Sequence, residues 1–538
     1  MKDGKRIKKR WAFLLLALFW AAVLFENHVF DPSSGIIRLS DGLQTGAVAP
    51  GLFAFLMIVW TVLVVFSFLL VAFVKGCGAR ELLILGILTG LVTIVLVPFA
   101  MPIDEVTHFF RAYSISSGHL LQTKTASGLV GDYVPEKLYY VMNKPANSMN
   151  LRSLFLDMKE WGQRVGGADN AFYENGYAGY YLPIGYLPAA VGLAFARLIK
   201  LPLFLIIYAG RLTNFLFYLA VCFAAFRKAP YFRNVFFLTA LNPGAVYLAC
   251  TYSTDGILIC QVLLFVSICL RYYFAEDTAR WMRQEGRKDS EIDRKTKIGA
   301  EDMTLLVASS VFIASMKTFT YSPILLLFFL IPSKSMSLRK RSAVLLICMA
   351  LLGLMGVGQA VLLREFTYND TRLASSTDTM GQIAYVMQHP VITGRLVLNF
   401  LDQNIYCLTG SVKTLQDGAG VEGVARICAV LPIFTAFLTK DRPDGERRHM
   451  GLVAFALILY VIEVLALILS LYIISTDVGG KEIIGMQSRY MLPLLPILYL
   501  LMAHLPIGGR MGDYDGFIGY MSVFALFAML VTNVVAWA

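Results

Sequence analysis

The pair of acidic residues Asp104 and Glu105 is the strongest candidate for chemistry in this sequence. The pair follows Pro102 at the end of an apolar stretch, and His108 and Arg111 come shortly after it. If a helix begins at this point, Asp104, His108 and Arg111 share one face, because they are four and then three residues apart. A carboxylate near a histidine can act as a general base, and an acidic pair can bind a divalent cation. The structural alternative is that both acids stabilise the first turn of a helix.

The remaining candidates are isolated polar residues near the ends of apolar stretches. Cations at a membrane surface suit a phosphate group, which arginine can bind through two hydrogen bonds at once. The structural alternatives are a snorkelling side chain for each cation and a helix N-cap for the acid. These candidates are Arg211, Asp255, Lys317, Tyr321, Arg489 and Tyr490.

Glu463 differs from all of these because it lies near the middle of the apolar stretch Met450–Ile474. An ionisable side chain at that depth of a membrane is costly and is often functional. The sequence assigns no role to it.

The composition restricts the classes of protein to which the chain can belong. Of the 538 residues, 57% are hydrophobic and 15% are charged, whereas soluble domains are about 25% charged. The apolar residues form runs of about 20, which match a hydrocarbon layer about 30 Å thick. These features exclude a soluble enzyme, a nucleic-acid-binding protein, a disordered chain and a porin-type barrel. The cysteines include no C-x-x-C pair, so neither a disulfide framework nor a zinc site is predicted.

The basic residues predict which loops lie inside the cell. The net charge of +11 has to be read loop by loop, because Lys and Arg gather on the cytoplasmic side of membrane proteins. A basic segment precedes the first apolar stretch, Trp11–Phe25, which is predicted to be a retained span with a cytoplasmic N-terminus. If Tyr181–Lys200 lies in the membrane interface instead of crossing, the later basic loops also face the cytoplasm. Pro183 and Pro188 near its start suit such a bent segment.

The predicted fold is therefore all-α, a polytopic integral membrane protein with about 13 transmembrane helices. Two of them flank Lys317 and are too short to cross a bilayer, which is typical of segments that line a cavity. The inside loop 271–297 is predicted to be a solvated helical connector. The predicted spans are Trp11–Phe25, Gly51–Val74, Leu82–Met101, Leu203–Phe226, Val235–Cys250, Gly256–Leu270, Met303–Ser315, Ser322–Ile331, Ala343–Leu363, Val421–Leu438, Met450–Ile474, Tyr490–Leu505 and Phe517–Trp537.

Two long external loops are predicted, at about 102–202 and 364–420. The chain divides into extra N-terminal spans at 1–80, a membrane domain at 81–505 and a C-terminal span at 506–538. The protein is expected in the cell membrane as a multi-pass protein, with the candidate loops on the extracytoplasmic side.

An ordered set of motifs resembles a large family of predicted bacterial membrane proteins, known as domain of unknown function 2142. Its opening motif combines a proline, an acidic pair, a histidine, Arg-Ala-Tyr and a glycine. One departure is Ser488, at a position where the family has a glycine. The resemblance covers roughly residues 80–500. The matching segments are Met101–Tyr113 with Gly118, Tyr181–Pro188, Gly210–Asn214, Leu241–Pro243, Ser253–Asp255, Lys317–Pro323 and Gly485–Pro493.

That family is similar to the integral-membrane glycosyltransferases of the GT-C type. Those enzymes have an acidic pair in the first external loop and interfacial helices after it, and their sugar donors are linked to polyprenyl phosphate. The resemblance implies that Asp104 or Glu105 is the catalytic base and, if a divalent cation is needed, its ligand. Substrate-binding roles are implied for His108, Arg111, Arg211, Asp255, Lys317, Tyr321, Arg489 and Tyr490. Of these, Arg211, Lys317 and Arg489 are expected to bind the donor phosphate in one outward-opening cavity.

The leading hypothesis is a membrane glycosyltransferase that moves a sugar from a polyprenyl-phosphate-linked donor at the outer membrane face. The acceptor is a glycan, a lipid or a protein, and cell-surface glycan is the expected product. Two other classes stay open: a glycolipid or polysaccharide transporter or flippase, and a non-catalytic membrane subunit. A flippase should carry polar groups through mid-membrane depth. In this sequence most of the charged residues within the apolar region lie near its outer side, and Glu463 is the exception. A subunit should tolerate loss of the acidic pair. The expected partners include membrane lipid but no nucleic acid.

Overall fold

The computed structural model describes most of the chain from residue 50 onward. The described residues are 13–14, 16–18, 20–21, 50–97, 99, 102, 104–127, 129–136, 138–139, 170–175, 182–316, 320–365, 378–409, 431–438, 450–504 and 515–535. Lys317 and most of the predicted spans Trp11–Phe25 and Val421–Leu438 lie outside them.

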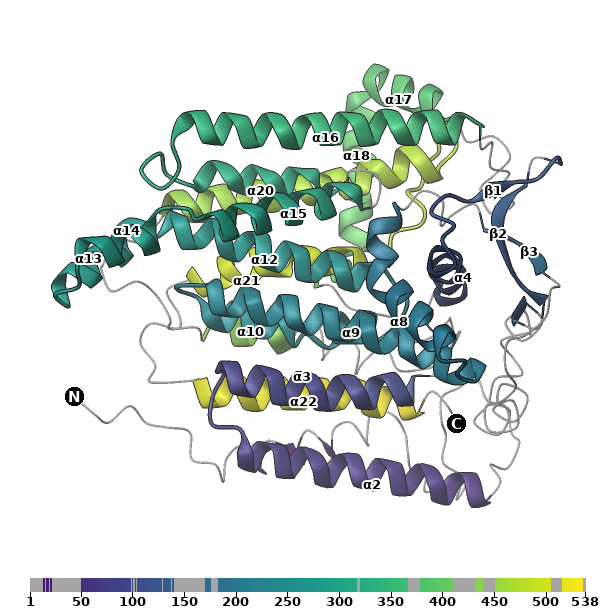
Figure 1. Ribbon diagram of the computed structural model, residues 1–538, viewed down its shortest axis with the longest axis horizontal. Coiled ribbons are helices and arrows are strands. Elements are labelled where there is room, and N and C mark those ends of the chain that lie inside the picture. The colour runs from purple at the N-terminus through teal and green to yellow at the C-terminus, as the bar shows by residue number, and fades with distance from the viewer. Residues whose placement is uncertain are drawn as a thin grey trace.

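Long apolar helices run side by side and form the body of the molecule (Figure 1). Each follows an apolar stretch of the sequence, because a helix satisfies its own backbone groups where water is absent. Helix α12 is the central one: nearly all of its residues are buried, and it packs against α9 and α15. The long helices are α2 (Pro50–Phe73), α3 (Ala79–Leu96), α9 (Leu203–Lys228), α12 (Asp255–Tyr273), α15 (Ala300–Ser315), α16 (Leu338–Glu365), α20 (Met450–Ser475) and α22 (Asp515–Val535).

Among the described residues, five helical segments are long and apolar enough to cross a membrane, and shorter apolar helices accompany them. The structure therefore confirms a helical protein with several candidate spans, but not the predicted number of about 13. One predicted span, Val235–Cys250, is wrong as a single helix. It forms α10 (Arg233–Ala240) and α11 (Pro243–Ala249), because the Asn242 side chain accepts hydrogen bonds from the amides of Gly244 and Ala245 and starts a new helix.

The two apolar segments around Lys317 form separate elements, but the first is not too short, because it belongs to the candidate span Asp289–Ser315. Helix α15 ends at Ser315, and the chain continues as η4 (Ser322–Leu330), a 3₁₀ helix. The far ends of the two elements meet, since the amide of Ile298 donates to the carbonyl of Ser335 at 3.2 Å. Together the two elements form a hairpin, and Tyr321 lies near its tip, directly before η4.

The segment between α3 and α9 contains a small antiparallel sheet that the all-α prediction missed. Its strands are β1 (Thr123–Lys124), β2 (Val130–Pro135) and β3 (Asn170–Glu174), in the order β1-β2-β3. The sheet lies beside α4 (Glu105–Ser116), which is oriented crosswise to the long helices at one end of the bundle (Figure 1). We call this end of the molecule the sheet end. Its strands are too short to leave a clear alternation in the sequence.

The segment Tyr181–Lys200 forms the short helices η2 (Pro183–Tyr186) and α8 (Leu187–Leu198) in its described part. A helix of 12 residues is about 18 Å long, which is less than the hydrocarbon thickness of about 30 Å. One side of α8 packs on α4 and α9, and the other exposes Leu187, Val191, Phe195 and Leu198. This arrangement agrees with a segment that lies in the interface.

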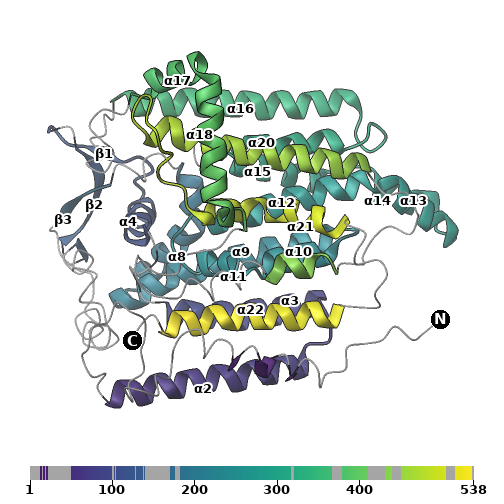
Figure 2. The same cartoon turned by 180° about the vertical axis from the view of Figure 1, so that it is seen from behind.

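The remaining described elements join or cover the long helices. At the end of the bundle opposite the sheet, α13 (Ala275–Gln284) and α14 (Asp289–Thr296) form the predicted helical connector (Figure 1). Helix α17 (Thr379–Gln388) leads into α18 (Pro390–Gln403), which runs crosswise to the long helices (Figure 2). The last elements that matter for the site are η5 (Ile405–Thr409), η6 (Ser488–Leu494) and α21 (Leu495–His504).

Candidate functional site

Asp104 stands directly before α4 in a left-handed backbone conformation, with φ 62° and ψ 9°. Such a conformation is uncommon outside glycine, although aspartate tolerates it better than most residues, and it is found at functional sites. The Asp104 side chain makes no hydrogen bond to the first amides of α4. It therefore does not cap the helix by a hydrogen bond, whereas Glu105 does lie in the first turn of α4, as the structural alternative expected.

The Asp104 carboxylate instead binds Arg489, which lies 385 residues away in the sequence. The Nη2 atom of Arg489 donates to Oδ2 of Asp104 at 2.8 Å. The Nε atom of the same arginine lies 3.6 Å from Oδ2 of Asp255, at the start of α12. The Asp104 side chain is 37% exposed, whereas the side chains of Arg489 and Asp255 are 8% and 5% exposed. Asp104 is thus the member of this ion cluster that water or a substrate can reach.

Glu105 has a different environment although it adjoins Asp104. Both of its oxygens accept hydrogen bonds from Arg211, at 2.9 Å from Nε and 2.6 Å from Nη2, and both side chains are fully buried. The remaining Nη1 of Arg211 donates to the carbonyls of Ile94 and Val97 at 3.2 and 2.6 Å. Those carbonyls belong to the last turn of α3, where helical partners are lacking. Arg211 therefore clamps the end of α3 to the start of α4.

This clamp argues against two predicted roles. Glu105 lies away from solvent, so it is poorly placed to accept a proton from a substrate. Arg211 is saturated by protein acceptors, so it is poorly placed to bind a phosphate. The expectation of a single cavity that contains both Arg211 and Arg489 is not supported by these contacts, because each arginine serves its own carboxylate.

His108 and Arg111 also turn toward the protein. The Nδ1 atom of His108 lies 2.7 Å from the hydroxyl of Tyr186 in η2. Arg111 is buried and binds Oδ1 of Asp132 in β2 at 3.2 Å, and its other nitrogen donates to the carbonyl of Leu120. These contacts brace α4 against η2 and the sheet, so both residues position the helix that carries Asp104.

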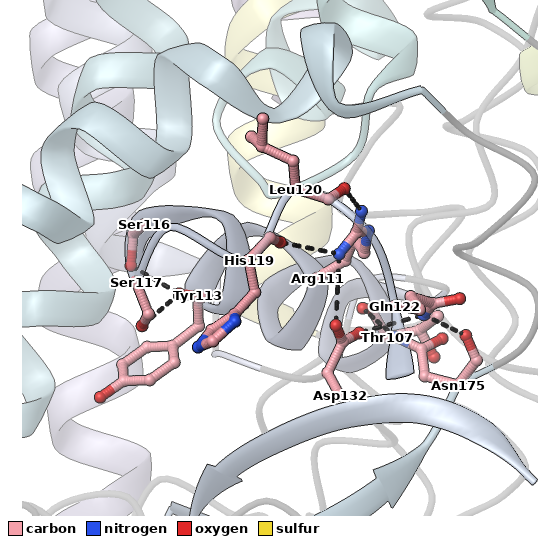
Figure 3. Close-up of polar contacts among 10 residues, drawn as sticks. All are labelled: Thr107, Arg111, Tyr113, Ser116, Ser117, His119, Leu120, Gln122, Asp132 and Asn175. Atoms are coloured by element: carbon pink, nitrogen blue, oxygen red, sulfur yellow. Dashed lines mark hydrogen bonds and ion pairs between the residues drawn. The ribbon is translucent and has the colours of Figure 1, made fainter. Parts of the chain in front are cut away.

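The contact between α4 and the sheet is a buried polar network (Figure 3). The amide of Gln122 donates to Asp132 at 3.0 Å and to the carbonyl of Asn175 at 2.7 Å, and the Asn175 side chain donates to the carbonyl of Thr107 at 2.9 Å. Burial raises the pKa of Asp132, although Arg111 acts to lower it. Sequence reasoning missed Gln122, Asp132 and Asn175, because they come from irregular stretches without a recognisable spacing.

The remaining predicted residues connect the hairpin of α15 and η4 with η6. The hydroxyl of Tyr321 donates to the backbone carbonyl of Tyr490 at 2.8 Å, and Tyr321 is fully buried. The guanidinium of Arg489 lies over the ring of Tyr490, 5.6 Å from its centroid. Asp255 occupies the first turn of α12, where Thr254 is the N-cap residue. The tip of the hairpin therefore supports the segment that presents Arg489.

Several residues of the recognised motifs have packing roles. A Cβ atom at Gly210 would lie 2.3 Å from the hydroxyl of Tyr252, which donates to the carbonyl of Ile207 at 2.7 Å. Asn214 donates to the carbonyl of Thr251 at 2.9 Å, and Asn242 donates to the hydroxyl of Tyr499 at 3.1 Å. These contacts hold α9, α11, α12 and α21 in the arrangement that brings Asp104, Asp255 and Arg489 together.

Asp104 and Glu105 do not converge on one point, because they bind different arginines. Within the part of the chain that the structure describes, no group of three or more His, Cys, Asp and Glu residues is placed to hold a metal ion. We call Asp104, Asp255 and Arg489 the Arg489 ion cluster. The described geometry supports chemistry at this cluster, with Asp104 as its exposed member.

Comparison with known proteins places the chain in a family. None of the curated proteins and none of the solved structures that were compared matches it. A family described as "Predicted membrane protein (DUF2142)" matches residues 87–498, which include α4, the sheet, the Arg489 ion cluster and the hairpin of α15 and η4. The chain belongs to this family of predicted membrane proteins.

Proposed function

We propose that the protein is a membrane glycosyltransferase of the GT-C type that uses a polyprenyl-phosphate-linked sugar, with Asp104 as its catalytic base. One observation carries the proposal: a partly exposed aspartate in a left-handed conformation is held by an arginine from the other end of the sequence. Strained polar residues that distant segments fix in place are typical of functional sites. The cluster lies at the sheet end, which we propose to be extracytoplasmic.

In the proposed reaction, a hydroxyl of the acceptor attacks the anomeric carbon of the donor sugar. The bond between that carbon and the phosphate oxygen breaks, and polyprenyl phosphate leaves as the anion. Asp104 accepts the hydroxyl proton as the new glycosidic bond forms. Its carboxylate is suited to this step because it is partly exposed and oriented by a hydrogen bond from Arg489.

Arg489 has a second part in the proposal. Its planar donor set lies beside the partly exposed Asp104, and an arriving phosphate would compete with that carboxylate for the donors. A phosphate that binds Arg489 weakens the hold of this arginine on Asp104. Donor binding would then free the Asp104 carboxylate to contact the acceptor hydroxyl.

The exposed side of α8 fits the lipid part of such a donor. Leu187, Val191, Phe195 and Leu198 form an apolar strip beside α4, the helix that follows Asp104. A short helix with one apolar side can lie at the boundary between headgroups and acyl chains. The phosphate of a lipid-linked sugar would lie at the same level, near the ion cluster.

Transport of a glycolipid or polysaccharide is the second candidate function, and Glu463 favours it. This acid lies in the middle of α20 and is fully buried. Polar groups at that depth mark transport pathways in many membrane proteins. A non-catalytic subunit is the third class, and it predicts that the ion cluster is dispensable.

The test uses full-length protein in lipid membranes with radiolabelled sugars linked to polyprenyl phosphate. We expect the wild type to transfer sugar. The turnover of Asp104→Asn should be lower by a factor of about 10²–10⁴, the usual contribution of a general base. Asp402→Asn is the matched control, because Asp402 is an exposed aspartate on α18. Full turnover of Asp104→Asn would remove the catalytic assignment. Movement of intact lipid-linked sugar across the membrane without transfer would favour the transporter.

A further inference from the structure

Glu463 is a buried acid that the proposed reaction does not use. It is the one acidic or basic residue of α20, all of which the structure describes. It lies thirteen residues after Met450 and twelve before Ser475, which places it about 20 Å from either end of the helix. Its side chain is fully shielded from solvent. The acid therefore lies at the centre of the most apolar candidate span.

No donor satisfies the Glu463 carboxyl group. Both of its oxygens are buried and have no hydrogen-bond partner within the described part of the chain. The carboxyl group faces η4, and the backbone of Ile324 lies near it. The amide of Ile324 already donates to the carbonyl of Tyr321 at 3.2 Å. A carboxylate in this position would lack the donors that an ionised group requires.

The charged residues of the surrounding elements have other partners or face outward. The elements packed against α20 are η4, η6, α17, α18 and α21, and η4 contains no titratable side chain. Arg489 of η6 serves the ion cluster, and Arg395 and Asp402 of α18 are exposed. The described titratable residues of these elements and their caps are Tyr321, Asp378, Tyr385, His389, Arg395, Asp402, Arg489, Tyr490, Tyr499 and His504, and none of them forms a hydrogen bond or ion pair with Glu463.

An isolated carboxylate in an apolar interior is so costly that the group takes up a proton instead. The cost of an unpaired buried ion is several kcal/mol even after the surroundings relax, about the size of a whole domain's stability. We propose that Glu463 is a proton-binding site within the membrane-embedded core and that its carboxyl group carries the proton in this conformation.

The position of this site links the proton to a deformable element. A 3₁₀ helix of nine residues, such as η4, is longer than the usual three or four residues and marks strain or a hinge. If Glu463 lost its proton, η4 would have to move and offer backbone donors, or a cation would have to enter. Tyr321, the N-cap residue of η4, donates a hydrogen bond to the carbonyl of Tyr490, which adjoins Arg489. The proton thus stabilises the arrangement of η4 that supports the ion cluster, whatever the substrate is.

Infrared spectroscopy of the full-length protein in lipid membranes at neutral pH tests the proposal. A protonated carboxylic acid has a carbonyl stretching band that an ionised carboxylate lacks. We expect this band in the wild type, its loss in Glu463→Gln, and its presence in the control Glu276→Gln, which changes an exposed acid bound to Lys334. A wild-type spectrum that Glu463→Gln leaves unchanged would overturn the proposal, because Glu463 would then be ionised.

Two further measurements protect the test against a variant that fails to fold. Glutamine has nearly the size of a neutral glutamic acid, so Glu463→Gln should retain the wild-type midpoint of thermal unfolding at neutral pH. A large decrease would show that the negative charge is required and would contradict the proposal. The apolar reagent dicyclohexylcarbodiimide adds to protonated carboxyl groups, so it should modify Glu463 in the wild type. The yield of this modification should fall as the pH rises. A yield that does not fall with rising pH would count against a titrating proton.

Discussion

At the scale of single residues, two adjacent acids have opposite roles. Asp104 is partly exposed and belongs to the Arg489 ion cluster, whereas Glu105 forms a fully buried ion pair with Arg211. The adjacent positions diverge because Asp104 takes a left-handed conformation and Glu105 begins α4. Substitutions of the two acids should therefore separate catalysis from stability.

We predict that Glu105→Gln destabilises the protein by about 3–5 kcal/mol, because Arg211 then keeps a buried charge without a counterion. The measurement is the midpoint of thermal unfolding, together with the amount of protein in the membrane. The matched control is Glu301→Gln, which removes an exposed partner of Lys228 at 2.7 Å and should cost less than about 1 kcal/mol. Equal effects of the two substitutions would show that the buried pair contributes no more than a surface pair.

Arg489→Lys keeps the positive charge but loses the donor geometry. Lysine has a single nitrogen, so it cannot reach both Asp104 and Asp255 as the guanidinium does. We predict that KM for the lipid-linked sugar rises about 10- to 100-fold, the equivalent of one charged hydrogen bond, with little loss of folded protein. Arg395→Lys on the exposed side of α18 is the control. An unchanged KM would remove the donor-binding role of Arg489.

At the scale of elements, close helix contacts bring the ion cluster together. Gly210 of α9 lets Tyr252 approach, and Tyr252 in turn leads into Asp255 at the start of α12. The buried network of Arg111, Asp132 and Gln122 fixes α4 to the sheet. The geometry of the Arg489 ion cluster therefore depends on helix packing at some distance from the cluster.

We predict that Gly210→Ala destabilises the protein by about 1–3 kcal/mol, the usual cost of an overpacked interior. The added Cβ would meet the Tyr252 hydroxyl at 2.3 Å and its ring atoms at 2.8 Å. Gly353→Ala in α16 is the control, because no atom lies within 4 Å of its Cβ. Thermal unfolding in detergent compares the two variants. Similar unfolding midpoints would mean that α9 and the Tyr252 segment can separate without loss of stability.

At the scale of the whole molecule, the two ends of the bundle differ in kind. The sheet end carries α4, the strands and the ion cluster, and the opposite end carries the charged connector of α13 and α14 (Figure 1). The positive-inside interpretation of the sequence predicts that the two ends face opposite sides of the membrane, with Arg280–Lys297 cytoplasmic and Thr125–Asn175 external.

We predict that an impermeant thiol reagent added to intact cells labels Ser127→Cys and does not label Ser290→Cys. Both serines are exposed, in the turn between β1 and β2 and in α14, so access depends on the side of the membrane. The background lacks accessible native cysteines. Labelling of both positions after the membrane is broken is the positive control. Labelling of Ser290→Cys in intact cells would reverse the proposed orientation and place the ion cluster in the cytoplasm.

The sequence by itself determined the helical membrane class, most of the long helices, the break around Lys317 and the family. Long apolar runs and ordered local motifs carry that information, because helices form within continuous segments of chain. The tertiary structure decided which charged residue meets which. Spacing could not show that Asp104 binds Arg489 or that Glu105 binds Arg211, since these pairs join segments more than a hundred residues apart. The sheet and its network likewise depend on contacts between distant short strands, which leave no periodic signal in the sequence.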